Sequence, residues 1–142
     1  MNRSDLQEIS RIRIREARTL LRFGLYHGAF YLTGYAVECA IKACICNQTK
    51  RFDFPDKKLA SRAWVHNLEE LMGLAGLTPE LVRAIKSDQR FDLNWAVAKD
   101  WSEDSRYDSR TTALQAQNLY SACTARKSGI LPWIRKRWSR VH

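Results

Sequence analysis

Apolar residues recur at helical spacing along most of the chain, and the first segment to show this spans residues 5–23. With positions placed about 100° apart, its apolar face consists of Leu6, Ile9, Ala17, Leu20 and Leu21. The opposite face carries a stripe of arginines, Arg11, Arg15, Arg18 and Arg22. Ser4 and Gln7 have the spacing of a capping box, which begins a helix. The pattern predicts an amphipathic helix over residues 5–23, with Arg13 pointing into its apolar side.

The next segment, residues 27–46, is apolar on nearly every side, which predicts a helix buried in the centre of the protein. Its polar edge is narrow and consists of Tyr31, Tyr35, Glu38 and Lys42. Glu38 and Lys42 stand in the i, i+4 order that favours an ion pair. The length approaches that of a membrane span, but charged residues at that depth are costly in lipid. We therefore expect a core helix and no membrane partner.

Turn signals divide the remainder of the chain into a loop and shorter helices. Residues 47–65 predict a long basic loop. Helices are expected over residues 67–75, 78–98 with a break near 88–92, 109–127, and a last short segment opened by Pro132. No segment alternates as a strand would. The sequence predicts an all-α fold, an up-and-down bundle of about five helices that forms a single domain over residues 1–142.

Composition is typical of a cytoplasmic globular protein. A chain of 142 residues with 45% hydrophobic content can bury a core without disulfide or metal cross-links. No secretory leader is evident before the first predicted helix. Among the four cysteines, Cys44 and Cys46 point about 200° apart on a helix, which does not suit binding of one ion. We expect free thiols in a reducing compartment, with no metal and no cofactor.

The distribution of charge indicates an anionic partner. The formal net charge is +9, and residues 109–142 contain no acidic residue. A basic surface of this kind attracts nucleic acid or another polyanion, so RNA and nucleotide are candidate partners. Trp133 and Trp138 in the basic tail either stack on bases or fill the core, and we favour the core.

The residues of the first two predicted helices resemble those of HEPN domains, a family of helical bundles. The most specific element is GYAVECAIKA at residues 34–43, and the other matches there are Arg15-Glu16-Ala17, Leu20-Leu21, Gly24, Tyr26, Gly28-Ala29 and Tyr31-Leu32. The family's third helix is matched by His66-x-Leu68-x-x-Leu71 and Ala75-Gly76-Leu77. The segment before its last long helix is matched by Trp101 and Arg106-Tyr107. The similarity covers most of the chain and is weakest in the basic loop and the C-terminal tail.

The resemblance implies a helical bundle that pairs as a homodimer. Many members of the family are metal-independent ribonucleases, some of them toxins encoded beside a nucleotidyltransferase partner, and others are noncatalytic binding modules. Catalytic members carry an R-x(4–6)-H motif. Arg106 stands where the arginine of that motif is expected, but Thr111, Thr112 and Ala113 occupy the positions for the histidine. The chain therefore lacks the usual nuclease motif.

Other arginine–histidine pairs fit the spacing of that motif. They are Arg22 with His27, and Arg137 or Arg135 with His142. Arginine is so frequent in this chain that pairs of this spacing arise by chance. We interpret them as coincidental.

The polar edge of the central helix is the best candidate site. The candidate ligand-binding residues are Tyr31, Tyr35, Lys42, Tyr107 and Arg13. A carboxylate on a buried helix calls for a partner, and Glu38 would hold Lys42, Arg106 or Arg13 towards an anionic ligand. The alternative is an internal ion pair that fixes helix packing. The sequence leaves both interpretations open.

His66, Arg106 and Glu38 are the candidate catalytic residues. His66 would serve as an acid–base group and Arg106 would stabilise a phosphorane, a combination that suits a ribonuclease without metal. Alternatively, His66 is a helix cap or a hydrogen-bonded core histidine, and we favour this interpretation. Arg106 and Tyr107 have two possible roles. Arg106 binds a phosphate while Tyr107 stacks on a base, or Arg106 forms an ion pair with a loop carboxylate such as Asp104.

Three functions are therefore open at the level of sequence. The first is a noncatalytic or weakly active module that binds RNA, nucleotide or a protein partner. The second is a ribonuclease toxin with a divergent site made of His66, Arg106 and Glu38. The third is a helper subunit that docks a nucleotidyltransferase.

Overall fold

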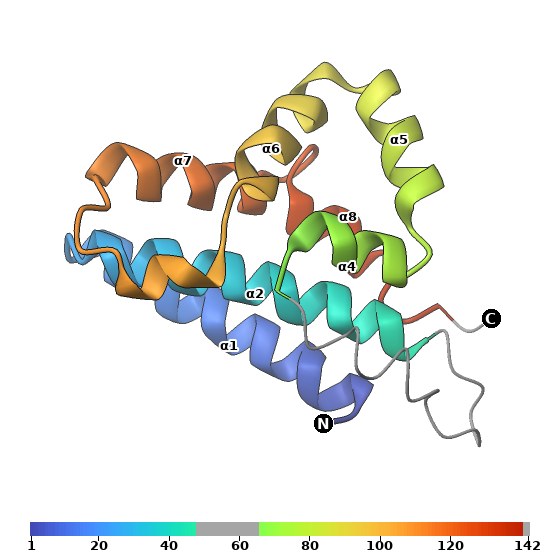
Figure 1. Cartoon of the computed structure of the whole chain (residues 1–142), viewed down its shortest axis with the longest axis horizontal. Coiled ribbons are helices and arrows are strands. Elements are labelled where there is room, and N and C mark those ends of the chain that lie inside the picture. Colours follow the sequence, from blue (N-terminus) through green and yellow to red (C-terminus); the bar gives the residue numbers. More distant parts are fainter. Residues whose placement is uncertain (48–65, 141–142) are drawn as a thin grey trace.

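The computed structural model describes residues 1–47 and 66–140, and every regular element in that part of the chain is a helix. The elements are α1 (Arg3–Arg22), α2 (Tyr26–Cys46), α4 (Leu68–Leu74), α5 (Thr78–Ser87), α6 (Gln89–Lys99), the 3₁₀ helix η1 (Glu103–Tyr107), α7 (Ala113–Thr124) and α8 (Ile130–Arg135) (Figure 1). The predicted all-α fold is confirmed. The predicted basic loop, apart from Asn47, and His142 lie outside the described residues.

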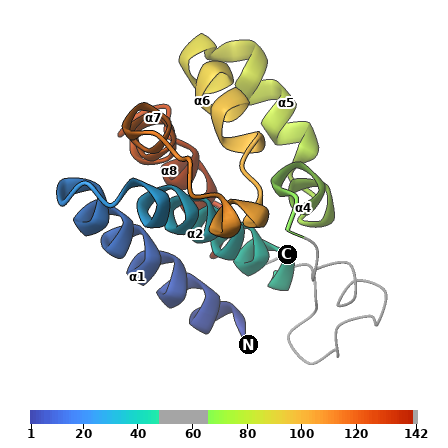
Figure 2. The same ribbon diagram turned by 60° about the vertical axis from the view of Figure 1, so that its left-hand side comes forward.

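Helices α1 and α2 form an antiparallel hairpin, and the other helices cover the opposite side of α2 (Figures 1 and 2). Gly24 makes the turn between them with φ +74°, a backbone conformation that favours glycine. The Leu25 N–H donates to the Leu20 carbonyl oxygen at 2.9 Å, which closes the end of α1. The hairpin places the arginine stripe of α1 away from α2.

The N-terminus of α1 differs from the prediction. The helix begins at Arg3 because Asn2 caps it, with the Asn2 Oδ1 accepting from the Asp5 N–H at 2.9 Å. The Asp5 carboxylate accepts from the Asn2 N–H at 3.2 Å and completes the capping box. The predicted box of Ser4 and Gln7 is therefore wrong, since Asn2 and Asp5 have the same spacing two residues earlier.

Helix α2 is the centre of the hydrophobic core. Its side chains at Ala36, Val37, Ala40 and Ile41 are fully buried, between α1 on one side and α4, α7, α8 and η1 on the other. Its length and composition would let it cross a membrane, but 67% of its most apolar window is buried inside the protein. Core helices of soluble proteins have the same length and composition.

The segment predicted as one helix over residues 78–98 forms two, and the break lies where it was expected. Asp88 leaves the helical conformation at φ −139° and ψ 103°, and its carboxylate caps α6 by accepting the Phe91 N–H at 3.1 Å. The second carboxylate oxygen accepts from the Ser128 hydroxyl at 2.8 Å. Helix α7 is shorter than predicted, because Thr112 caps it through a box with Gln115.

The C-terminal segment folds back on the start of the chain. The Asn47 amide donates to the Trp138 carbonyl oxygen at 2.9 Å and accepts from Arg3 at 2.8 Å. Trp138 is buried and Trp133 packs against the core, so the core interpretation of both tryptophans is confirmed. Helix α8 begins at Ile130, two residues before the predicted start at Pro132. This return brings Arg135, at the end of α8, to Arg11 of α1.

Buried thiols give the fold a pH dependence at alkaline pH. Burial raises the pKa of Cys39 from 9.0 to about 11 and the pKa of Cys44 and Cys123 to about 12. Because the folded pKa values lie above the unfolded value, the stabilisation is complete below pH 9.0 and is lost as the pH rises through 11 to 12. We expect urea-unfolding curves to show constant stability from about pH 7 to 8.5 and a decline above that range.

Reactivity of the same thiols provides the check on that expectation. Cys39, Cys44 and Cys123 are free and buried, so few thiolates are present in the folded protein. A thiol reagent at about pH 8 should label them slowly until denaturant is added. Rapid labelling of all three in the folded protein would contradict the burial described here.

Candidate functional site

Glu38 is a buried carboxylate on α2, only 1% exposed, and its partners are basic side chains. The Lys42 Nζ lies 3.0 Å from its Oε2, one turn further along α2. The Nδ1 of His66 lies 2.9 Å from both carboxylate oxygens. These bonds satisfy a charge that burial would otherwise make very costly. Glu38 therefore joins α2 to the residue that leads into α4.

The other ring nitrogen of His66 contacts a second carboxylate. His66 Nε2 lies 3.0 Å from the Oε2 of Glu103, the first residue of η1. We define the Glu38 cluster as Glu38, Lys42, His66 and Glu103. Each ring nitrogen of His66 contacts a carboxylate in this cluster, so neither is free to take a proton from a substrate.

The stacked rings of Tyr31 and Tyr35 lie beside the Glu38 cluster. Their rings stack with centroids 6.0 Å apart, and Tyr31 also stacks on Trp101 at 6.1 Å. Burial raises the pKa of Tyr35 to about 12, with further contributions from Cys39 and Glu38. Tyr35 is therefore a neutral hydroxyl at physiological pH, and it does not serve as an acid–base group there.

Arg106 does not join the Glu38 cluster. Its guanidinium lies over the Tyr107 ring at 4.7 Å, and the Tyr107 side chain is 75% exposed. Interaction with Tyr107, then with Tyr31 and Glu103, raises the pKa of Arg106. Among the described residues it has no ion pair with Asp104. The structure thus brings together Glu38 and His66 of the three catalytic candidates, and places Arg106 on the exposed side of η1.

Arg13 lies outside the Glu38 cluster, half-buried at the edge of the apolar side of α1, where it interacts with Tyr35 and Cys39 of α2. Its guanidinium pairs with Glu16 on the exposed side of α1. This hydrogen bond is the main reason why the pKa of Arg13 is raised. A long side chain can bury its stem beside the apolar side of a helix while its charge reaches a partner three residues away.

The arginine–histidine pairs of motif spacing have other roles in the structure. His27 bonds through Nε2 to the carbonyl oxygen of Arg106 at 2.9 Å, which anchors η1 to the start of α2. Arg137 lies over the Trp133 ring at 3.8 Å and pairs with Glu80 at 3.4 Å. His142 lies outside the described residues, so our interpretation of the spacing as coincidental stays a prediction.

Sequence reasoning missed a cavity between α1, α7 and α8. We call it the arginine cavity, because its polar lining consists of Arg15, Arg18, Arg135, Tyr120 and Thr124. The arginine stripe of α1 and the acid-free tail were visible in the sequence. Their convergence was not, because Arg135 lies far along the chain from Arg15 and only the return of the C-terminal segment unites them.

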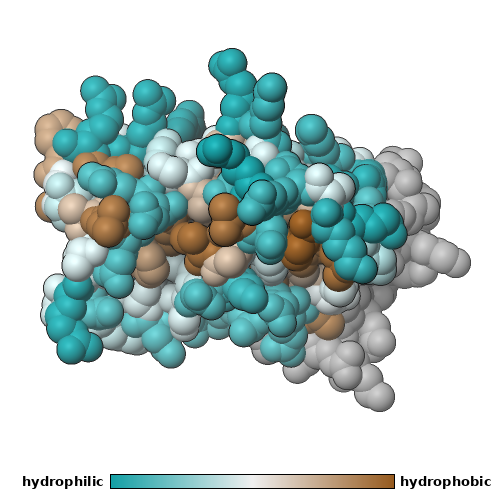
Figure 3. Space-filling view, turned by 90° about the horizontal axis from the view of Figure 1, so that it is seen from above, coloured by the Kyte–Doolittle hydropathy of each residue, from teal (hydrophilic) through white to brown (hydrophobic). Residues whose placement is uncertain are grey.

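Exposed apolar side chains of the described residues do not suggest a second candidate functional site. The face seen from above the bundle carries a broken band of apolar residues between hydrophilic ones (Figure 3). Exposed apolar side chains on α5 and α6 include Val82, Leu93 and Val97. Within residues 1–47 and 66–140, no group of three or more His, Cys, Asp or Glu side chains is placed to hold a metal ion.

No protein-family model matches this chain, and no curated protein or solved structure does. The resemblance to HEPN domains therefore stays a prediction from the residues quoted above. The geometry of the Glu38 cluster and of the arginine-rich side of α1 carries the functional conclusion.

Proposed function

We propose that this protein is a helical RNA-binding module that does not cleave its ligand. The binding surface is the arginine face, which we define as Arg11, Arg15, Arg18, Arg22 and Arg135. One observation carries the proposal: in the described part of the chain, none of these guanidinium groups has a carboxylate partner. Four other arginines in the described part of the chain do have a carboxylate partner: Arg13 with Glu16, Arg110 with Asp108, and Arg137 and Arg140 with Glu80.

Unpaired positive charges at close range repel one another, and a polyanion relieves that repulsion. Arg11 and Arg135 both lie over the Trp138 ring, at 4.9 and 5.7 Å from its centroid. Burial lowers the pKa of Arg135, and the positive charge of the neighbouring Arg11 lowers it further. Phosphates along a strand of RNA would neutralise such a row and release counterions, which makes binding favourable and dependent on salt.

The Glu38 cluster supports the absence of cleavage. A metal-independent ribonuclease needs a base for the 2′-hydroxyl, and both nitrogens of His66 already contact carboxylates. Arg106, which would stabilise the phosphorane, lies outside that cluster. A binding module also agrees with the noncatalytic members of the family that the sequence resembles. Homodimerisation and docking of a nucleotidyltransferase stay predictions from that resemblance.

A ribonuclease is the second candidate, and one contact favours it. A histidine held by a buried carboxylate at 2.9 Å is how catalytic bases are oriented in many enzymes. For His66 to act in this way, Glu103 would have to leave Nε2. Cleavage of RNA by the pure protein, abolished by His66→Ala or Arg106→Ala, would establish this function in place of the first.

The test combines binding and integrity of RNA in one sample. The pure protein is mixed with end-labelled single-stranded RNA in a metal chelator, and the products are separated on native and denaturing gels. We expect a retarded, intact RNA for the wild type. Arg15→Gln/Arg18→Gln should weaken binding roughly tenfold or more, because two phosphate contacts are lost.

Arg110 offers a matched control for that variant. Its side chain is 91% exposed and lies outside the arginine face. Arg110→Gln removes the same kind of charge and should leave RNA affinity within about twofold of the wild type. Equal weakening by both variants would mean that the overall charge, and not the arginine face, attracts RNA.

A further inference from the structure

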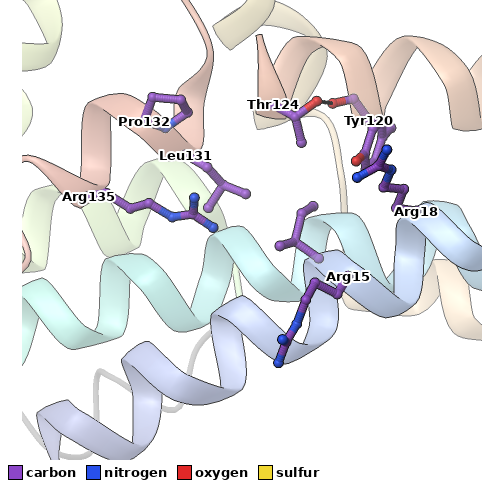
Figure 4. A pocket seen from close by; sticks show the side chains of 8 residues that line it. Arg15, Arg18, Tyr120, Thr124, Leu131, Pro132 and Arg135 are labelled. Carbon is purple, nitrogen blue, oxygen red and sulfur yellow. Dashed lines mark hydrogen bonds between the residues drawn. The ribbon is translucent and has the colours of Figure 1, made fainter. Parts of the chain in front are cut away.

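The arginine cavity is small and half enclosed by side chains from three helices. Its volume is about 220 Å³, and Figure 4 shows Arg135 reaching into it from α8 on one side, with Arg18 of α1 and Tyr120 of α7 on the other side. Pockets that hold a whole drug-sized ligand measure about 300–1,000 Å³. The arginine cavity is therefore of a size for one chemical group and not for a complete nucleotide.

The polar groups around this cavity offer donors that the protein itself does not use. The Nε of Arg135 is buried and has no hydrogen-bond partner among the described residues. Arg15 and Arg18 are exposed at the opening, and neither has an ion pair in the described part of the chain. In Figure 4 the Arg15 guanidinium points away from Arg135, so Arg15 lies at the opening without contacting Arg135. The lining contains no acidic residue.

Charge and donor geometry select the kind of group that fits. Planar guanidinium groups bind carboxylates and phosphates through paired hydrogen bonds. A carboxylate brings one negative charge, whereas a terminal phosphate brings about −1.5 to −2 at neutral pH and three acceptor oxygens. Arg18 and Arg135, with the Tyr120 hydroxyl, supply two positive charges and an additional donor. The doubly charged phosphate matches them better.

We propose that the arginine cavity binds a terminal phosphate group, held by Arg135, Arg18 and the Tyr120 hydroxyl. This inference rests on the proposed function, because it gives one end of an RNA strand a place on the arginine face. A terminal phosphate occurs on an RNA 5′ end and on a free nucleotide. Both carry the same group, and the experiment distinguishes them.

The experiment compares two RNA strands of one sequence, with a 5′-phosphate and with a 5′-hydroxyl, by fluorescence anisotropy in chelator. We expect the phosphorylated strand to bind about tenfold more tightly, since charge-assisted hydrogen bonds to the extra group are made in a partly buried site. Arg18→Gln and Arg135→Gln should each reduce that ratio to about one. Adenosine monophosphate competes against the labelled strand in a parallel titration, with adenosine as its control.

Variants and controls keep the result interpretable if folding is disturbed. Arg18 is exposed, so Arg18→Gln should fold even if the half-buried Arg135 does not tolerate glutamine, and thermal unfolding monitors both. Arg110→Gln removes the same kind of charge outside both the cavity and the arginine face, and should keep the tenfold ratio. Equal binding of the two strands by the wild type, or an unchanged ratio in Arg18→Gln, would overturn the phosphate site.

The outcomes separate this inference from the proposed function. Salt-dependent RNA binding with no preference for the phosphorylated strand would leave the binding module standing and remove the phosphate site. Binding of the monophosphate but not of adenosine or RNA, lost in Arg18→Gln, would support the site with a free nucleotide as its ligand and contradict RNA binding.

Discussion

Replacing Glu38 with alanine is expected to lower the free energy of unfolding by about 3 kcal/mol, because it leaves the half-buried Lys42 and His66 without their carboxylate partner. The carboxylate is fully buried and bonds to both basic groups. For a domain of this size, the melting temperature should fall by about 10 °C or more. Thermal and urea unfolding followed by circular dichroism measure the change.

Glu103 provides the matched control at the other side of His66. Its side chain is 29% exposed and forms the same kind of contact with the ring, so water screens it. Glu103→Ala should cost no more than about 1 kcal/mol. Glu38→Gln keeps the volume and should fall between the two alanine variants. If Glu38→Ala were no more destabilising than Glu103→Ala, the Glu38 cluster would not be the internal cross-link described here.

The same variants separate structure from function. If the Glu38 cluster is a structural cross-link, folded Glu38→Gln should bind RNA with the affinity of the wild type at low temperature. A selective loss of RNA affinity in a folded protein would place Glu38 in the ligand site and contradict its structural role.

Replacing Gly34 with alanine is expected to destabilise the protein by about 3 kcal/mol, near the upper end for overpacking of a core. An added Cβ would lie 2.1 Å from two ring atoms of Trp101, which is buried and cannot move aside freely. The indole lies directly against the backbone of α2 at this point and holds the chain leading into η1. Urea unfolding of Gly34→Ala measures the cost.

Gly28 is the matched control because it lies in the same helix. Its added Cβ would meet only the end of the flexible Leu20 side chain, at 3.0 Å. Alanine favours a helix interior over glycine by about 1 kcal/mol, so Gly28→Ala should be close to neutral. In a Trp101→Leu background the cost of Gly34→Ala should shrink. A constant cost in both backgrounds would show that the indole is not what makes glycine necessary.

Much of the fold follows from the spacing of apolar residues. The burial of α2 follows from a segment that is apolar all round, and the break before α6 from the polar residues at 88–92. The helix ends were harder to place. Asn2 and Thr112 compete with nearby polar residues as caps, and only the packing of the helices decides which residues leave the helix.

The candidate site was predictable only where its partners are close in sequence. Glu38 and Lys42 pair at i, i+4, as their spacing predicted. His66 and Glu103 come from distant segments, so their contact depends on how η1 and the start of α4 lie on α2. The arginine cavity was even less predictable from the sequence than the Glu38 cluster. Arg135 reaches α1 only because the C-terminal segment folds back on the start of the chain.

The slope of RNA affinity against salt tests the central claim most directly. Each phosphate neutralised on a single strand contributes about −0.7 to the slope of log K against log salt, so contacts from all members of the arginine face predict about −3.5. Arg15→Gln/Arg18→Gln should reduce the slope to about −2, while Arg110→Gln leaves it unchanged, and the RNA stays intact throughout. Identical slopes for the wild type and the double variant, or degraded RNA in chelator, would contradict the account of a non-cleaving arginine face.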